Sequence, residues 1–130
     1  MRTNAGLRLG LIAAATALIA ACGGSSGGID LPLLTPDPQS PTISALNIAF
    51  DRSEVAVPAG RAFILVFENR EALPHNVSIY GDVSFRDAKF EGNIFSGPAT
   101  QPYPVPALAP GTYRFRCDIH PIMVGLIVAS

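Results

Sequence analysis

Short segments of alternating apolar and polar residues, separated by turn-forming residues, limit this chain to a fold made of strands. The segment YRFRC shows the alternation most clearly, because Tyr113, Phe115 and Cys117 fall on one face and the two arginines between them fall on the other. A period of two residues is typical of a strand with one buried face. No long segment has the 3.6-residue period of an amphipathic helix. The sequence therefore predicts an all-β protein, with an antiparallel sandwich or barrel as its architecture.

The expected strands differ in how deeply they should be buried. The segment 61–69 is almost continuously apolar, as expected for a central strand, whereas the proline-rich segment 101–108 suits an edge strand or an irregular extended segment. The segment 81–97 mixes charges, glycines and aromatic residues, and we expect a loop there with a short helical turn. The remaining strands are expected at 43–50, 54–60, 75–80, 113–117 and 124–130.

The N-terminus has the features of an export signal. Arg2 and Arg8 form a positive region before a thirteen-residue, mainly apolar run at 9–21, which is too short to span a bilayer as a helix. The run ends in small residues directly before Cys22, and this ending resembles the lipobox of bacterial lipoproteins; an ordinary signal peptide is the alternative. We therefore expect a signal peptide at 1–21, a lipid-modified Cys22 on a Gly/Ser/Pro-rich tether at 22–41, and one folded domain at 42–130. The protein would be extracytoplasmic and anchored by lipid to a bacterial membrane.

Charge and cysteine content narrow the possible functions. Without Arg2 and Arg8, seven basic residues remain against ten acidic ones, and this balance gives no basic surface for nucleic acid. If Cys22 carries a lipid, Cys117 is left without a disulfide partner in an oxidising compartment. Burial or metal ligation would protect this thiol from oxidation.

The exported chain has very few imidazole and sulfur groups beyond Cys22. They are His75, Cys117, His120 and Met123, and the last three lie in the pattern Cys-x2-His-x2-Met. Cys117 continues the core face of its strand, and His75 continues the face of Val77 in the segment 75–80. Each lies at one end of its strand, so the two can meet at one end of a sandwich, with His120 and Met123 on the adjoining loop.

The donor set indicates copper. Two histidines and a cysteine with a weak axial methionine form the arrangement of blue copper sites. Zinc could occupy Cys117 and the two histidines, but methionine is a poor zinc ligand and the spacing differs from that of zinc fingers. Taken singly, each residue would more often be structural: a hydrogen-bonded histidine, a small buried cysteine or a core methionine.

Two motifs, FENREALPHNVSIY and APGTYRFRCDIHPIM, resemble those of the cupredoxins, the small blue copper proteins that include plastocyanin, amicyanin and azurin. The resemblance covers about residues 43–130, and the short ligand loop is most similar to that of amicyanin. It implies a Greek-key β-sandwich that binds one copper ion, which alternates between Cu(I) and Cu(II), through His75, Cys117, His120 and, axially, Met123. It further implies that Asn76 hydrogen-bonds to the cysteine loop.

The resemblance also implies how electrons would pass. The edge of His120 would be the portal, surrounded by apolar residues, for which Leu73, Pro74, Pro121 and Ile122 are the candidates. The tether, the lipobox and the segment 81–97 lie outside the matching motifs. The charged stretch of this segment could face a partner, or it could be a solvated loop.

We expect a monomeric, membrane-tethered carrier of single electrons that meets its redox protein partners transiently. The alternative is copper storage, delivery or sensing without electron transfer, although the chain lacks Met- or His-rich stretches. An enzyme is not expected, because multicopper oxidases and copper nitrite reductases need more histidines, and the two-copper domain of cytochrome oxidase subunit II needs a second cysteine where this chain has Pro121. Acid should compete with the metal for His120, the ligand expected nearest to solvent.

Overall fold

The computed structural model describes residues 35–130, and all regular structure in this range is β-strand. The strands are β1 (Thr42–Leu46), β2 (Ala49–Phe50), β3 (Glu54–Val57), β4 (Phe63–Asn69), β5 (Pro74–His75), β6 (Ser78–Tyr80), β7 (Ala88–Glu91), β8 (Phe95–Ser96), β9 (Ala99–Val105), β10 (Gly111–Arg116) and β11 (Val124–Ala129). No helix in this range could cross a membrane. The predicted signal peptide, Cys22 and most of the tether lie outside the described residues.

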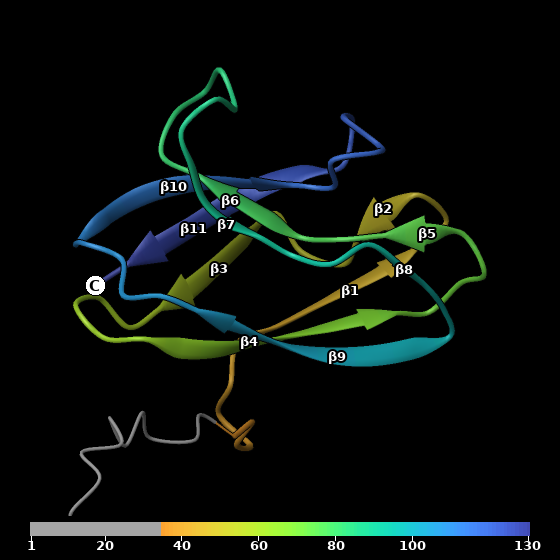
Figure 1. The fold of residues 1–130 in the computed structure, drawn as a ribbon, viewed down its shortest axis with the longest axis horizontal. Coiled ribbons are helices and arrows are strands. Elements are labelled where there is room, and N and C mark those ends of the chain that lie inside the picture. The colour runs from red at the N-terminus through yellow and green to blue at the C-terminus, as the bar shows by residue number, and fades with distance from the viewer. Residues whose placement is uncertain (1–34) are drawn as a thin grey trace, which may run out of the picture.

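Two sheets face each other and form a sandwich (Figure 1). One sheet has the order β2-β1-β4-β9, the other has the order β3-β11-β10-β6-β7, and β5 pairs separately with β8. Most pairs are antiparallel, but β1 runs parallel to β4 and β3 runs parallel to β11. The prediction of an all-β sandwich is confirmed.

The core lies between the sheets and follows the alternation in the sequence. Leu65 and Phe67 of β4 are fully buried, and they belong to the same apolar cluster as Ile79, Phe115 and Ile127 of the opposite sheet. Full burial of a large apolar side chain stabilises a fold by about 1.5–3 kcal/mol. Phe115 of β10 and Cys117, which directly follows this strand, are buried as predicted, and β10 pairs with β6 on one side and β11 on the other. This central position holds the end of β10, and thus Cys117, rigidly.

Several predicted strands have different limits in the structure. The segment 43–50 is a hairpin of β1 and β2, because Asn47 and Ile48 turn the chain with positive φ angles of 55° and 56°. The segment 75–80 divides into β5 and β6 at Asn76 and Val77, since its first part pairs with β8 and its last part with β10. The proline-rich segment does form an edge strand, β9, which begins at residue 99.

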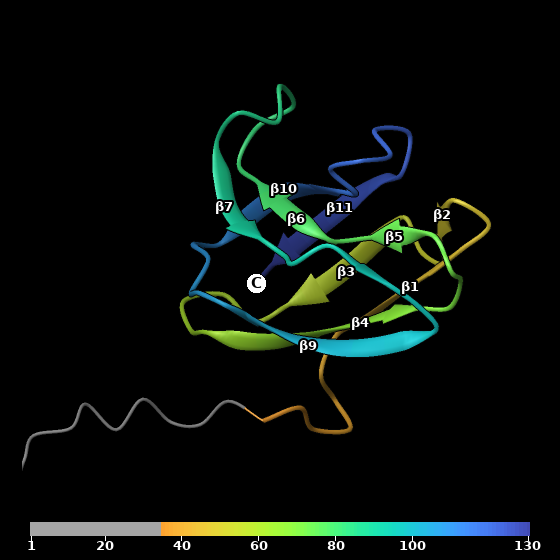
Figure 2. The ribbon, with the colours of Figure 1, turned by 45° about the vertical axis from the view of Figure 1, so that its right-hand side comes forward.

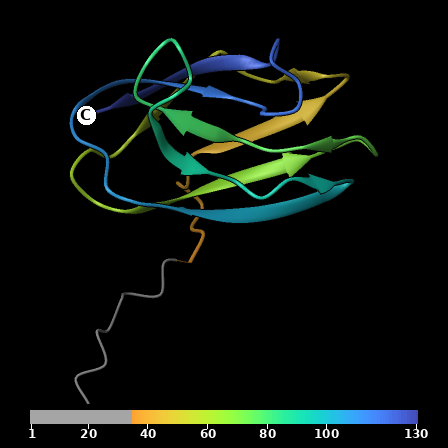
Figure 3. The same cartoon turned by 45° about the horizontal axis from the view of Figure 1, so that its top comes forward.

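The prediction of a loop with a helical turn at 81–97 was wrong. This segment contains β7, which completes the edge of the five-stranded sheet, and β8, which pairs with β5. Only residues 81–87 protrude, as Figures 2 and 3 show from two further directions. The mixed composition hid the strands because edge strands are exposed: three of the four residues of β7 face solvent.

Candidate metal centre

Three loops meet at one end of the sandwich, which we call the ligand end. They are the β1–β2 turn at 47–48, the β4–β5 connection at 70–73 and the β10–β11 loop at 117–123 (Figure 1). The parallel pairing of β1 with β4 puts the first two connections at the same end of one sheet, and the β10–β11 loop lies at this end of the facing sheet (Figure 1). The ligand end carries all four predicted metal ligands.

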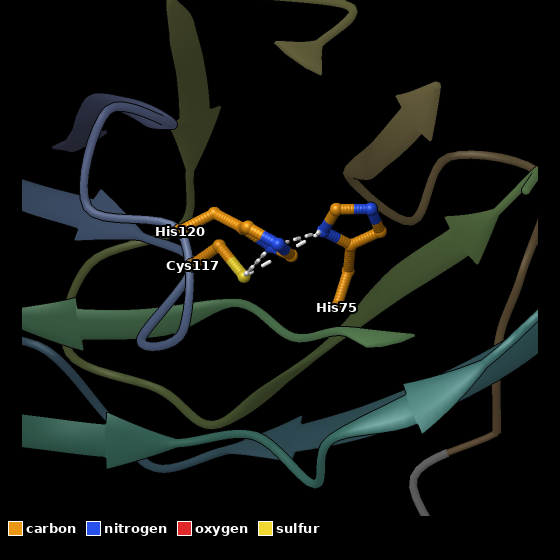
Figure 4. A group of neighbouring side chains, drawn as sticks. All are labelled: His75, Cys117 and His120. Atoms are coloured by element: carbon orange, nitrogen blue, oxygen red, sulfur yellow. Dashed lines mark hydrogen bonds between the residues drawn. The ribbon is translucent and has the colours of Figure 1, made fainter. Parts of the chain in front are cut away.

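His75, Cys117 and His120 converge at this end (Figure 4). The Nδ1 atoms of the two histidines are 3.1 Å apart, and Cys117 Sγ is 3.7 Å from His75 Nδ1 and 3.6 Å from His120 Nδ1. His75 and Cys117 are fully buried, whereas His120 is partly exposed. The predicted meeting of the strand ends is therefore confirmed for these three side chains.

The three donor atoms fit a single metal ion. A point equidistant from them lies about 2.0 Å from each, which matches the bond length of a first-row metal to nitrogen and is slightly short for sulfur. A thiolate with two imidazoles is a donor set that binds copper as well as zinc. The three groups could hold one metal ion between them, because their ligand atoms all lie within 4.8 Å of one another.

Met123 lies in the same loop and is almost fully buried. The loop is closed by backbone bonds: Cys117 N–H donates to Met123 O at 3.0 Å, and Met123 N–H donates to His120 O at 2.9 Å. These bonds fix the short Cys-x2-His-x2-Met spacing as one tight turn. Met123 therefore enters the core beside the cysteine rather than facing solvent.

Glu71 sets the tautomer of His75, a role that the sequence pattern did not predict. Its Oε1 lies 2.8 Å from His75 Nε2 and also accepts the N–H of Ile48 at 2.9 Å. The bond from Ile48 lowers the pKa of this carboxyl group, burial opposes the shift, and the bond with His75 lowers it further. A charged carboxylate requires the proton of His75 to be on Nε2, which leaves the lone pair of Nδ1 directed at the site.

Asn76 joins the segments that carry His75 and Cys117. Its Oδ1 accepts the N–H of Asp118 at 2.9 Å, and its Nδ2 donates to Asp118 Oδ2 at 2.8 Å and to Gly92 O at 2.9 Å. The bond to the residue after Cys117 is the contact that the family resemblance implied. The role of Asp118 was not predicted, although a charged residue directly after a buried cysteine is a sequence signal that could have indicated it.

The four residues expected around the portal are all exposed at the ligand end. Leu73 is 44% exposed and Ile122 is 81% exposed, and Pro74 and Pro121 also face solvent. Two further large apolar side chains are exposed on the same connections, Ile48 at 38% and Ile119 at 42%. The exposed apolar surface is therefore broader than the four residues predicted from the sequence.

Comparison with known proteins agrees with this fold. A family model described as a cupredoxin-like domain matches residues 11–129. Amicyanin-alpha of Methylorubrum extorquens is 34% identical over 91 residues, which cover 70% of this chain and 72% of that protein.

Solved structures share the fold. An auracyanin from Roseiflexus castenholzii has a TM-score of 0.63 at 22% identity, over 73% of this chain and 99% of that one. Amicyanin from Paracoccus versutus has a TM-score of 0.57 at 23% identity, over 73% of this chain and 85% of that one. Auracyanin A from Chloroflexus aurantiacus, described as a blue copper protein, has a TM-score of 0.61 at 22% identity, over 70% and 98%. The chain thus belongs to the cupredoxin-like family, whose members are copper-binding electron carriers rather than enzymes.

Proposed function

We propose that His75, Cys117, His120 and Met123 hold one copper ion, and that the protein carries single electrons between redox partners outside the cytoplasm. The observation that supports this most strongly is the convergence of a buried thiol and two imidazole nitrogens about one point. The bound ion would supply the reversible one-electron change. The two histidine Nδ1 atoms and the thiolate of Cys117 would hold the ion, and the thioether sulfur of Met123 would add a weak further ligand.

Rigid ligands favour this function over storage or delivery. Cys117 is held at the end of a central strand, and His75 is fully buried and fixed by Glu71. A carrier benefits from a site that changes little with oxidation state, whereas a protein that hands its copper on needs exposed, exchangeable ligands. Only His120 of the four is partly open to solvent.

Electrons would enter and leave through the edge of His120. The exposed apolar residues Leu73, Pro74, Pro121 and Ile122 would contact the partner and exclude water around the ring. Such a surface suits the small interfaces, commonly below about 1,200 Å², of transient redox complexes. We propose that the protein acts there as a monomer.

The N-terminal segment would tether the domain to a membrane through a lipid on Cys22. The described part of the tether joins β1 at Thr42, and β1 then runs towards the ligand end. The tether therefore enters away from His120 and would leave the portal open. Replacing Cys22 with serine should move the protein from the membrane fraction to the soluble fraction of cells; retention in the membrane would contradict lipid anchoring.

An absorption spectrum tests the copper site. The full chain, purified without metal in detergent and titrated with Cu(II), should develop an intense visible band that saturates at one ion per chain. The band should be absent in Cys117→Ser, since it arises from the thiolate, and it should persist in Val83→Ser, a substitution in the protruding 81–87 loop. Absence of the band in the unaltered protein, or preferential uptake of Zn(II), would refute the blue copper site.

A kinetic measurement separates a carrier from a storage or delivery protein. The copper-loaded chain should undergo repeated reduction and oxidation by a small redox protein without losing the metal to a chelator. Release of copper on reduction would favour delivery instead.

A further inference from the structure

Asp118 is the most highly connected carboxylate among the described residues. Its Oδ2 accepts bonds from Ser78 Oγ at 2.5 Å and Asn76 Nδ2 at 2.8 Å. Its Oδ1 accepts bonds from Tyr80 OH at 2.6 Å and Arg116 Nε at 3.2 Å. Four donors from two segments, 76–80 and the end of β10, thus hold one side chain, which directly follows Cys117.

The residues that donate hydrogen bonds to Asp118 are themselves buried or packed against aromatic rings. Asn76 and Ser78 are buried, and Tyr80 is 4% exposed. The guanidinium of Arg116 lies over the ring of Tyr80, 4.9 Å from its centroid, and over that of Phe85 at 4.6 Å. Burial raises the pKa of the Asp118 carboxyl group, but its bonds with Ser78, Tyr80, Asn76 and Arg116 outweigh burial and lower it. The group is therefore a carboxylate at neutral pH.

The bonds of Asp118 link the two ligand-bearing segments across the sheet. Asp118 and Asn76 exchange two hydrogen bonds, one from the Asp118 N–H and one from the Asn76 amide, and each residue directly follows a metal ligand. Charge-assisted bonds are roughly twice as strong as neutral ones, so this link is stiff. It fixes the position of Cys117 relative to His75, residues that are 42 positions apart in the chain.

We propose that Asp118 is a positioning residue for electron transfer: it clamps the Cys117 and His75 segments together so that the site keeps one geometry in both oxidation states. This inference rests on the proposed function. In that reaction one electron passes from a reduced partner to the site and then from the site to an oxidised partner. Asp118 neither gains nor loses a proton or a bond.

The test uses the full copper-loaded chain and the isosteric variant Asp118→Asn. The amide of asparagine turns a donor towards groups that are themselves donors, so at least one bond of the clamp is lost. We expect electron self-exchange to slow about tenfold, equivalent to about 1.4 kcal/mol of activation free energy. We also expect the reduction potential to rise, because a negative charge beside the site is removed. The metal-free variant should unfold at a lower urea concentration than the metal-free parent.

Asp87→Asn is the matched control. It removes the same charge from a carboxylate that also has a cationic partner, since Asp87 pairs with Lys89 at 2.9 Å, but it lies at the end of the protruding loop. This variant should retain both the self-exchange rate and the potential of the parent.

Tyr80→Phe keeps the proposal testable if Asp118→Asn does not fold. It removes one bond to Oδ1 while retaining the ring beneath Arg116, and self-exchange should slow about two- to threefold, or by about 0.4–0.6 kcal/mol. Loss of metal-free stability in either variant, with self-exchange and potential unchanged, would show that Asp118 is merely structural and overturn the proposal. Failure of the parent to develop the visible band would instead refute the copper site itself.

Discussion

His75 and His120 present their Nδ1 atoms to the same point, yet the protein around them differs sharply. His75 is fully buried, and its second ring nitrogen is held by Glu71, which is held in turn by the N–H of Ile48. His120 lies on a short loop and is partly exposed, and no hydrogen bond to its Nε2 is found within residues 35–130. His75 is therefore part of the rigid scaffold, whereas His120 connects the site to the surface.

The largest expected effect is on stability without metal. His75→Ala should lower the free energy of unfolding of the metal-free chain by about 2–5 kcal/mol, because it leaves a cavity and removes one of the two partners of the Glu71 carboxylate. His120→Ala should lower it by less than about 1 kcal/mol, since its ring is partly in water. Urea unfolding of both variants measures the difference, and equal losses would abolish the contrast between the two histidines.

Glu71 should matter only through His75. Glu71→Ala should weaken copper binding by about 10–100-fold, because the imidazole loses the partner that orients it. Glu68→Ala is the matched control, as this carboxylate bonds to Ser44 and Arg70 and contacts neither histidine. Competition with a copper chelator measures the affinities, and a similar loss in both variants would show that Glu71 has no specific role.

Acid should affect the exposed histidine first. A copper-bound imidazole must be neutral, so protons compete with the metal for His120 as the pH falls. Losing this ligand leaves His75 and the two sulfur donors, and because sulfur prefers Cu(I), the reduction potential should rise with decreasing pH. Voltammetry between neutral pH and about pH 4 measures this, and a flat potential across that range would contradict the assigned role of His120.

The β1–β2 turn should give the smallest effect. Ile48 has a φ of 56°, a conformation that strongly disfavours β-branched residues, yet its N–H supports Glu71. Glycine has no Cβ and avoids this strain, so Ile48→Gly should be more stable than Ile48→Ala by about 1 kcal/mol in urea unfolding. If alanine proved the more stable, the turn would not be strained.

Substitutions at Ile48 also test whether its side chain affects the metal site. Ile48 is partly exposed beside the proposed portal, so its removal would subtract apolar surface without touching a ligand. Both Ile48 variants should keep the visible spectrum of the parent, because the backbone bond to Glu71 persists. A changed spectrum would mean that the Ile48 side chain, and not only its N–H, shapes the His75 site.

Much of the fold and of the metal site could be predicted, because the alternation of apolar and polar residues in the sequence matches the buried and exposed faces of the strands. The alternation in YRFRC placed Cys117 on the core face, and the scarcity of histidine and sulfur left few candidates for a metal site. Strands at sheet edges were harder, as β7 and β8 show, because their exposed residues carry no apolar pattern. The division of 75–80 into β5 and β6 was also invisible, since both faces of this segment are buried.

The sequence by itself determined the all-β class, the ligand types and the spacing of the ligand loop, since each depends on residues that are neighbours in the chain. Only the tertiary structure decided that Glu71 orients His75, that the Ile48 N–H supports Glu71, and that Asp118 collects donors from β6, β10 and Asn76. Turns and cross-sheet pairings create these contacts. Hydrogen bonds need alignment to within a few tenths of an ångström, and strand periodicity specifies only the face on which a side chain lies.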